Sequence, residues 1–173
     1  MNQGTQKKIP DPQILKNLQS ADDMLVLKTL RKLRTSGNLT YIPEILKILN
    51  RGNNDLIEKE LIRFIADIKK PGIIPLVVAG LKKPGLKAAH AGILSATWQS
   101  GLDYSRYTDL FIQLFLDGDY LVALESFTVI EQSIEHLTAQ KIEEERKHLL
   151  DGLVNVSEEK KPLARELVNL LQT

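Results

Sequence analysis

Three histidines are the residues of this chain best suited to acid–base or metal chemistry, because imidazole titrates near neutral pH and ligates metal ions. They are His90, His136 and His148. The one adjacent histidine–glutamate pair is Glu135 followed by His136. His90 stands on an expected helix with no carboxylate cluster near it in the sequence. We therefore interpret His90 as a histidine on a helix surface or packed in a groove, and not as a metal ligand or general base.

Other catalytic chemistry leaves no signature in the sequence. The chain has no cysteine, which excludes disulfides, thiol nucleophiles and cysteine-based zinc sites. It contains no GxSxG, phosphate-binding loop or GxGxxG motif. Glu143, Glu144 and Glu145 are consecutive, so they point in different directions around a helix, whereas paired catalytic carboxylates must converge across a cleft. We predict that these three are solvated, and that the protein is not an enzyme and uses no cofactor or metal.

The composition predicts a globular protein. Of 173 residues, 43% are hydrophobic and 26% charged, and the net charge of +1 indicates no nucleic-acid or membrane partner for the chain as a whole. The N-terminal residues lack the apolar stretch of a signal peptide, and no window is apolar enough to span a membrane. We expect a cytoplasmic protein.

An internal repeat defines the elements that would position these side chains. Residues 22–53 align without gaps on residues 54–85, each unit being 32 residues long. Equivalent positions hold similar residues in the two units: Ile42 and Ile74, Pro43 and Pro75, Leu49 and Leu81. After one inserted residue, the pattern continues through residues 86–118, and it weakens in residues 119–156. The chain is therefore expected to repeat one structural unit four times.

Each unit is predicted to be a pair of helices. In the first unit, apolar residues follow helical spacing on both sides of a break at Ser36, Gly37 and Asn38. No alternation typical of strands occurs. Three residues are expected to cap helix N-termini with their side chains: Asp22, Asn54 and Asp119. Pro43 and Pro75 are expected within the first turn of their helices, where a missing N–H matters least.

The two ends are predicted to differ from the middle. Residues 10–20 suggest a short N-terminal capping helix. Residues 137–156 suggest a long helix with a polar face, and residues 157–172 a last helix capped by Ser157. The end units of a stacked array must present polar faces to water, which suits both ends. Residues 1–173 are thus predicted to be a single domain.

The repeat resembles the HEAT-repeat family in its short bacterial form. The resemblance rests on Asn54, Asp55 and Leu56 opening a helix and on the Ile-Pro pairs described above. It covers residues 22–131 well and departs in the third unit, where Thr108 replaces the proline. It implies an all-α, right-handed superhelical solenoid of about four helix pairs, with capping helices at both ends. The resemblance further implies a concave face lined by the second helices, and a role in binding other macromolecules.

Charge is distributed unevenly along the chain. Residues 28–87 contain thirteen Lys or Arg and five Asp or Glu, whereas residues 101–151 contain four Lys or Arg and eleven Asp or Glu. In a solenoid, this predicts a basic half and an acidic half. Four residues at the ends of second helices would form an anion-binding groove: Lys47, Arg51, Lys82 and Lys83. DNA glycosylases of HEAT-like fold are a precedent, although Trp98 is expected here at the core or its edge and not in such a groove.

The second helices have an inward and an outward ridge. The predicted core positions are Ile42, Ile45, Leu46, Leu49, Ile74, Val77, Val78, Leu81, Tyr107, Leu110, Phe111 and Leu114. The opposite ridge includes Glu44, Lys47 and Asp109, with four apolar residues at its centre: Leu76, Ala79, Ile112 and Phe115. These four are either the exposed floor of a binding groove or core residues that are covered by curvature or by the C-terminal helix.

Two functions follow as hypotheses. The first is a non-catalytic scaffold that binds another protein or peptide through the face formed by the second helices. The second is nucleic-acid binding or processing through the basic N-terminal half, for which duplex affinity should fall steeply with salt. A metal-dependent enzyme is the weakest alternative.

Overall fold

The computed structural model describes residues 9–34, 39–52 and 55–172. These residues form ten α-helices and seven short 3-10 segments and contain no strand. The predicted all-α class is therefore confirmed. The chain divides into two compact units, Met1–Ile93 and Leu94–Thr173, with the boundary inside α6 (His90–Ser100). The superhelix and the single domain stay predictions.

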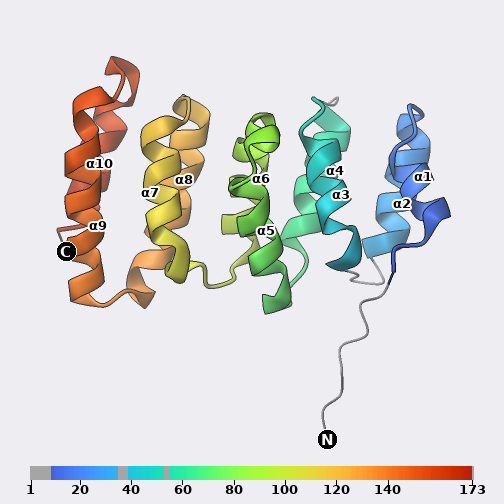
Figure 1. Ribbon diagram of the computed structural model, residues 1–173, viewed down its shortest axis with the longest axis horizontal. Coiled ribbons are helices and arrows are strands. Elements are labelled where there is room, and N and C mark those ends of the chain that lie inside the picture. The colour runs from blue at the N-terminus through green and yellow to red at the C-terminus, as the bar shows by residue number, and fades with distance from the viewer. Residues whose placement is uncertain (1–8, 35–38, 53–54, 173) are drawn as a thin grey trace, which may run out of the picture. The chain divides into compact units, whose positions relative to one another are not determined.

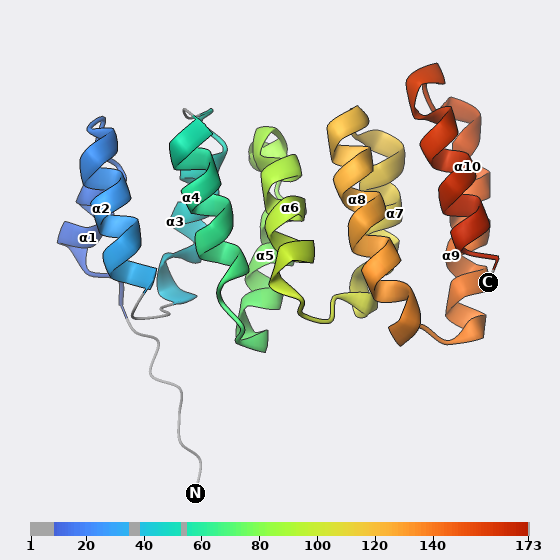
Figure 2. The same ribbon diagram turned by 180° about the vertical axis from the view of Figure 1, so that it is seen from behind.

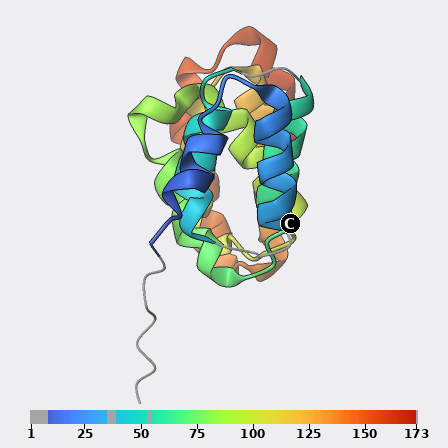
Figure 3. The same ribbon diagram turned by 90° about the vertical axis from the view of Figure 1, so that its right-hand side faces the viewer.

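Unit 1 consists of helices in two layers. Its complete helices are α1 (Pro12–Leu18), α2 (Asp23–Arg34), α3 (Ile42–Leu49), α4 (Asp55–Ala66) and α5 (Ile74–Leu81). α1 packs on α2 and α3, α2 packs on α4, and α3 packs on α5 (Figure 1). In Figure 3, the layer of α1 and α3 lies beside the layer of α2 and α4. α2 and α3 lie within the first predicted repeat, residues 22–53, and α4 and α5 lie within the second, residues 54–85.

Unit 2 also has two layers. Besides the end of α6, it contains α7 (Thr108–Asp117), α8 (Tyr120–Ser133), α9 (Ala139–Gly152) and α10 (Lys161–Leu170). α7 packs on both α8 and α9, and α10 packs on both α8 and α9. Figure 2 shows α8 and α10 side by side, with α7 and α9 behind them. α7 is thus covered by α8 on one side and by α9 on another.

Short-range chemistry fixes the helix starts. Asp22 Oδ1 accepts the N–H of Met24 at 2.9 Å, and Asp119 Oδ1 accepts that of Val122 at 2.9 Å, as predicted for N-caps. Pro43 and Pro75 lie in the first turns of α3 and α5, also as predicted. Asn54, and the break at residues 36–38, lie outside the described residues.

The predicted core positions of the second helices are largely correct. Nine of the twelve are buried, and the others, Ile74, Tyr107 and Leu110, are half-buried. α3 and α5 approach closely at Gly80, where a Cβ atom would lie 2.5 Å from Leu46 Cδ1. Only glycine allows that separation without a shift of Leu46, so this contact depends on the missing side chain.

An asparagine side chain joins two turns of unit 1. Asn50, which follows α3, donates from Nδ2 to the carbonyl of Gly85 at 2.9 Å and accepts the N–H of Ala89 at Oδ1 at 3.2 Å. Both partners belong to the 3-10 segment Pro84–Ala89. One amide side chain therefore satisfies a donor and an acceptor of the backbone that precedes α6.

A buried lysine side chain caps the C-terminal end of α7 in unit 2. Lys160 Nζ donates to the carbonyls of Phe115, Leu116 and Gly118 at 3.1, 2.8 and 2.8 Å. The final carbonyls of a helix lack intrahelical donors and carry partial negative charge, so a cation is favourable there. Burial lowers the pKa of Lys160, although Asp117, Glu159 and Asp119 act in the opposite direction. The expected cap at Ser157 is wrong: its side chain forms no capping hydrogen bond, and a 3-10 turn, Glu158–Lys160, precedes α10.

Candidate functional site

The predicted binding residues of unit 1 lie on α3 and α5. Lys47 and Ala79 are exposed, and Leu76 is half-buried. Glu44 is buried, so its place on an exposed ridge is a correction. The side chain is covered because it turns toward α1, where it meets Gln19. The exposed part of this face therefore combines one basic residue with small apolar surface.

Glu44 is held by three neighbours. Gln19 Nε2 donates to its Oε1 at 2.9 Å, Lys47 Nζ donates to Oε2 at 3.0 Å, and Arg51 Nη2 lies 3.8 Å from Oε1. Burial acts to raise the pKa of Glu44, but these hydrogen bonds and the two positive charges outweigh it and leave the pKa below 4.5. Glu44 is thus an ionised carboxylate that links α1 to α3.

The contacts of Glu44 also reduce the positive charge of the anion-binding groove predicted from the sequence. Lys47 and Arg51 both pair with Glu44, which offsets part of their positive charge. Lys82 and Lys83 are exposed directly after α5 and form no ion pair among the described residues. The four basic residues therefore do not form a uniformly positive surface.

The groove floor proposed for unit 2 is wrong in its two central residues. Ile112 and Phe115 are both 0% exposed, because α7 is covered by α8 on one side and by α9 on another. Of the two alternatives for these residues, the core is the correct one. Asp109, also on α7, is exposed.

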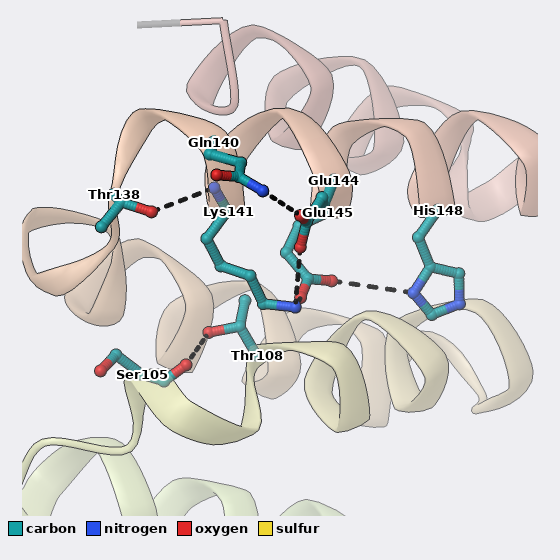
Figure 4. A network of polar contacts seen from close by, with 8 residues as sticks. All are labelled: Ser105, Thr108, Thr138, Gln140, Lys141, Glu144, Glu145 and His148. Carbon is teal, nitrogen blue, oxygen red and sulfur yellow. Dashed lines mark hydrogen bonds and ion pairs between the residues drawn. The ribbon is translucent and has the colours of Figure 1, made fainter.

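A polar network lies on α9 where it faces α7 (Figure 4). Lys141 Nζ is 2.7 Å from Glu145 Oε1, and His148 Nδ1 is 3.7 Å from Glu145 Oε2. His148 Nε2 in turn lies 3.3 Å from Gln113 Oε1 on α7. The hydrogen bond to Glu145 raises the pKa of Lys141, with smaller contributions from Glu144 and Asp109. The residues nearest to the Glu145 carboxylate, Lys141 and His148, thus lie on its own helix, and His148 also contacts Gln113 on α7.

The three consecutive glutamates are not equivalent. Glu143 and Glu144 are exposed, as expected of solvated surface. Glu145 is 1% exposed, which corrects that prediction. The helical period turns position 145 toward α7, so an acidic residue occupies the buried stripe of α9. The burial of Glu145 could not be predicted from apolar spacing, because Glu145 and the residues next to it in the sequence are charged.

The remaining histidines occupy different environments. His90 is buried at the start of α6, hydrogen-bonds to the backbone of Leu81, and has a buried Nε2 without a partner among the described residues. Burial, and to a lesser degree the charge of Lys87, lowers its pKa below 6.5. His136 is exposed, and its Nε2 is 3.8 Å from Glu135 Oε1. No group of three metal-ligating side chains occurs within the part of the chain that is described.

An apolar groove between α9 and α10 was not predicted. It has a volume of about 390 Å³ and continues along the 3-10 segment Leu153–Asn155. Apolar residues line it: Leu150, Leu153, Val156, Ala164 and Val168. Lys161, Arg165 and Asn169 contribute the polar part of its lining. One feature of the sequence could have indicated this groove. Residues 150–156 contain more apolar side chains than a single buried face of a helix would use.

Comparisons with known proteins leave the resemblance untested. No protein-family model, curated protein or solved structure matches this chain. Membership of the HEAT-repeat family therefore stays a prediction. Within the described ranges, no helix has both the length and the apolar character needed to cross a membrane.

Proposed function

We propose that the protein is a non-catalytic binding module that captures a segment of another protein. The observation that carries this proposal is the apolar groove between α9 and α10. Leu150, in its wall, is 40% exposed, and Val154, which follows the lining residue Leu153 in the sequence, is 88% exposed. Uncovered apolar side chains that surround a groove are typical of partner-binding surfaces.

The occupant that suits this groove is an amphipathic helix with an acidic residue beside its apolar stripe. Lys161, Arg165 and Asn169 are spaced four residues apart on α10, so they form one polar edge of the groove. Lys161 already pairs with Glu158, whereas Arg165 forms no ion pair within the described residues. A carboxylate on the partner would supply the charge that Arg165 lacks.

This proposal keeps the function predicted from the sequence, which is protein binding without catalysis, but places it at the groove between α9 and α10. α9 is a second helix in the predicted fourth pair, so the groove still uses a second helix. The other residues first assigned to partner binding that remain accessible are Lys47, Leu76, Ala79 and Asp109. The nucleic-acid alternative has weaker support, because Glu44 lies between Lys47 and Arg51.

Photo-crosslinking from the groove tests the proposal. A benzophenone amino acid at position 150 is expected to capture a partner segment from native lysate, and the same probe at position 121 is the control. Leu121 is 53% exposed on α8, outside the groove. A synthetic peptide of the captured segment should bind the wild-type protein and lose about tenfold or more in affinity on Leu150→Glu or Arg165→Glu, which corresponds to about 1.4 kcal/mol.

Three results would contradict the proposal. One is crosslinking at position 150 that does not exceed that at position 121. Another is a captured segment with no acidic residue beside an apolar stripe. The third is a peptide that binds Arg165→Glu as tightly as it binds the wild-type protein. Circular dichroism should show unchanged helix content in both variants, since both positions are accessible to solvent.

A further inference from the structure

A second recess lies in unit 2, away from the groove between α9 and α10. It is a cleft of about 310 Å³ formed by the end of α6, the loop that follows it, and the end of α8 with the 3-10 segment Ile134–His136. Its lining includes Trp98, Leu102, Asp103, Tyr104, Glu135 and His136. Its volume is at the lower end of the range for ligand sites, so it suits a single side chain or a small molecule.

One wall of the cleft is aromatic and fixed in orientation. The indole Nε1–H of Trp98 donates to Glu125 Oε2 at 2.6 Å, which anchors the ring to α8. Tyr104 is 2% exposed, and burial raises the pKa of its hydroxyl to about 12, so it stays neutral. Its ring also packs edge-on against Phe111. The wall therefore includes an indole whose Nε1–H is held by Glu125.

The charged part of the lining is mostly acidic. Asp103 Oδ1 accepts the N–H of Ser105 at 2.8 Å. Hydrogen bonds from the side chain and backbone of Ser105 hold the pKa of Asp103 below its usual value, so this carboxylate is ionised at neutral pH. Glu135 also lines the cleft and is exposed, and its Oε1 lies 3.8 Å from Nε2 of His136. Neither lysine nor arginine lines the cleft.

We propose that this cleft binds a guanidinium group, stacked on the indole of Trp98 and paired with the carboxylates of Asp103 and Glu135. A guanidinium suits this lining better than an ammonium, because its planar, weakly hydrated cation stacks on aromatic faces and donates two parallel hydrogen bonds to a carboxylate. The group can belong to a free guanidino compound or to an arginine side chain of a peptide. The inference does not depend on the groove between α9 and α10.

Trp98 provides the measurement, because it is the one tryptophan of the chain and lines the cleft. The full-length protein is titrated with N-acetyl-arginine amide while the tryptophan emission is recorded. N-acetyl-citrulline amide, which has nearly the same shape without the charge, is the matched ligand control. We expect a saturable change with the arginine compound and binding at least about tenfold weaker with the citrulline compound.

Two protein variants locate the effect. Asp103→Asn keeps an oxygen that can accept the Ser105 N–H and removes the charge, and it should weaken binding about fivefold. Asp109→Asn removes an exposed charge from α7, outside the cleft lining, and should leave binding unchanged. The peptide Gly-Arg-Gly distinguishes the sources: tighter binding than the amide indicates an arginine in a peptide chain, and equal or weaker binding indicates a free guanidino compound.

The proposal fails on any of three results. The first is an emission change that does not saturate. The second is equal binding of the citrulline compound. The third is an equal loss in Asp103→Asn and Asp109→Asn, which would indicate attraction to the net acidic charge of residues 101–151 and no defined site.

Discussion

Two buried carboxylates, Glu44 in unit 1 and Glu145 in unit 2, are held in different ways. Both lie on second helices of predicted pairs and both have a lysine nearby. Glu44 also accepts a hydrogen bond from Gln19, the residue directly after α1, so it connects the end of α1 to α3. The lysine and the histidine nearest to the carboxylate of Glu145, Lys141 and His148, are on α9 itself. From this difference we infer a rule: a buried charge contributes strongly to stability when its partners belong to another element, and weakly when they lie on its own helix.

Lys160 gives the strongest test of this rule, since its side-chain hydrogen bonds go to the end of α7 and the loop that follows it. Lys160→Met should lower the free energy of unfolding by about 3 kcal/mol, because three carbonyls lose their donor. Chemical denaturation followed by circular dichroism measures this. Lys161→Met is the matched control, since Lys161 is exposed and pairs only with Glu158 within the described residues. Similar losses in the two variants would contradict the rule.

Glu44→Leu tests the connection between α1 and α3. The substitution removes the hydrogen bonds from Gln19 and Lys47, and we expect a loss of about 2 kcal/mol in the same denaturation experiment. Because the pKa of Glu44 is lowered on folding, its ionised form stabilises the native state above pH 4.5, and this stabilisation is lost as the pH falls through the folded-state pKa. The acid sensitivity in this range should be weaker in the variant. An unchanged acid transition would argue against the link.

His90 extends the comparison to a buried base. Its pKa is lowered on folding, so the unfolded state binds the proton more readily. Stability due to His90 is therefore fully present above pH 6.5 and is lost as the pH falls from 6.5 through the lower folded-state value. His90→Gln should flatten the decline in melting temperature below pH 6.5. His136→Gln is the control, since His136 is exposed; an equal flattening in both variants would exclude burial as the cause.

Glu145→Leu should have the smallest effect. Removing one member of a buried ion pair is costly when the other charge stays buried, but the side chain of Lys141 is 39% exposed and can be hydrated once Glu145 is replaced by leucine. We expect the free energy of unfolding to stay within about 1 kcal/mol of wild type, with Lys141 released into solvent. A loss comparable to that in Glu44→Leu would show that Glu145 has a contribution from α7 beyond its partners on α9.

Much of the fold was predictable because it follows from local patterns. The turn chemistry and the Ile-Pro pairs placed α3 and α5, and aspartates at the start of apolar runs identified two N-caps. These features depend on residues close together in the sequence. The cap predicted at Ser157 failed because the residue that closes a helix here, Lys160, acts on α7, which ends more than forty positions earlier in the chain.

The candidate sites were less predictable. Ile112 and Phe115 were correctly recognised as a second apolar ridge of α7, but the sequence does not say how many neighbours a helix has. Two apolar ridges can mean a groove floor or a helix covered on both sides. The cleft beside Trp98 depends on the separation between α6 and α8, and no pattern in either helix encodes that separation.

The absence of a side chain at position 80 has one more consequence. At Gly80, the backbone of α5 lies so close to α3 that an added Cβ atom would be 2.5 Å from Leu46 Cδ1. A single added methyl group would contact the Leu46 side chain at this crossing and require it to shift. Gly80→Ala would therefore show whether the flexible side chain of Leu46 can move to make room, or whether α3 and α5 must separate.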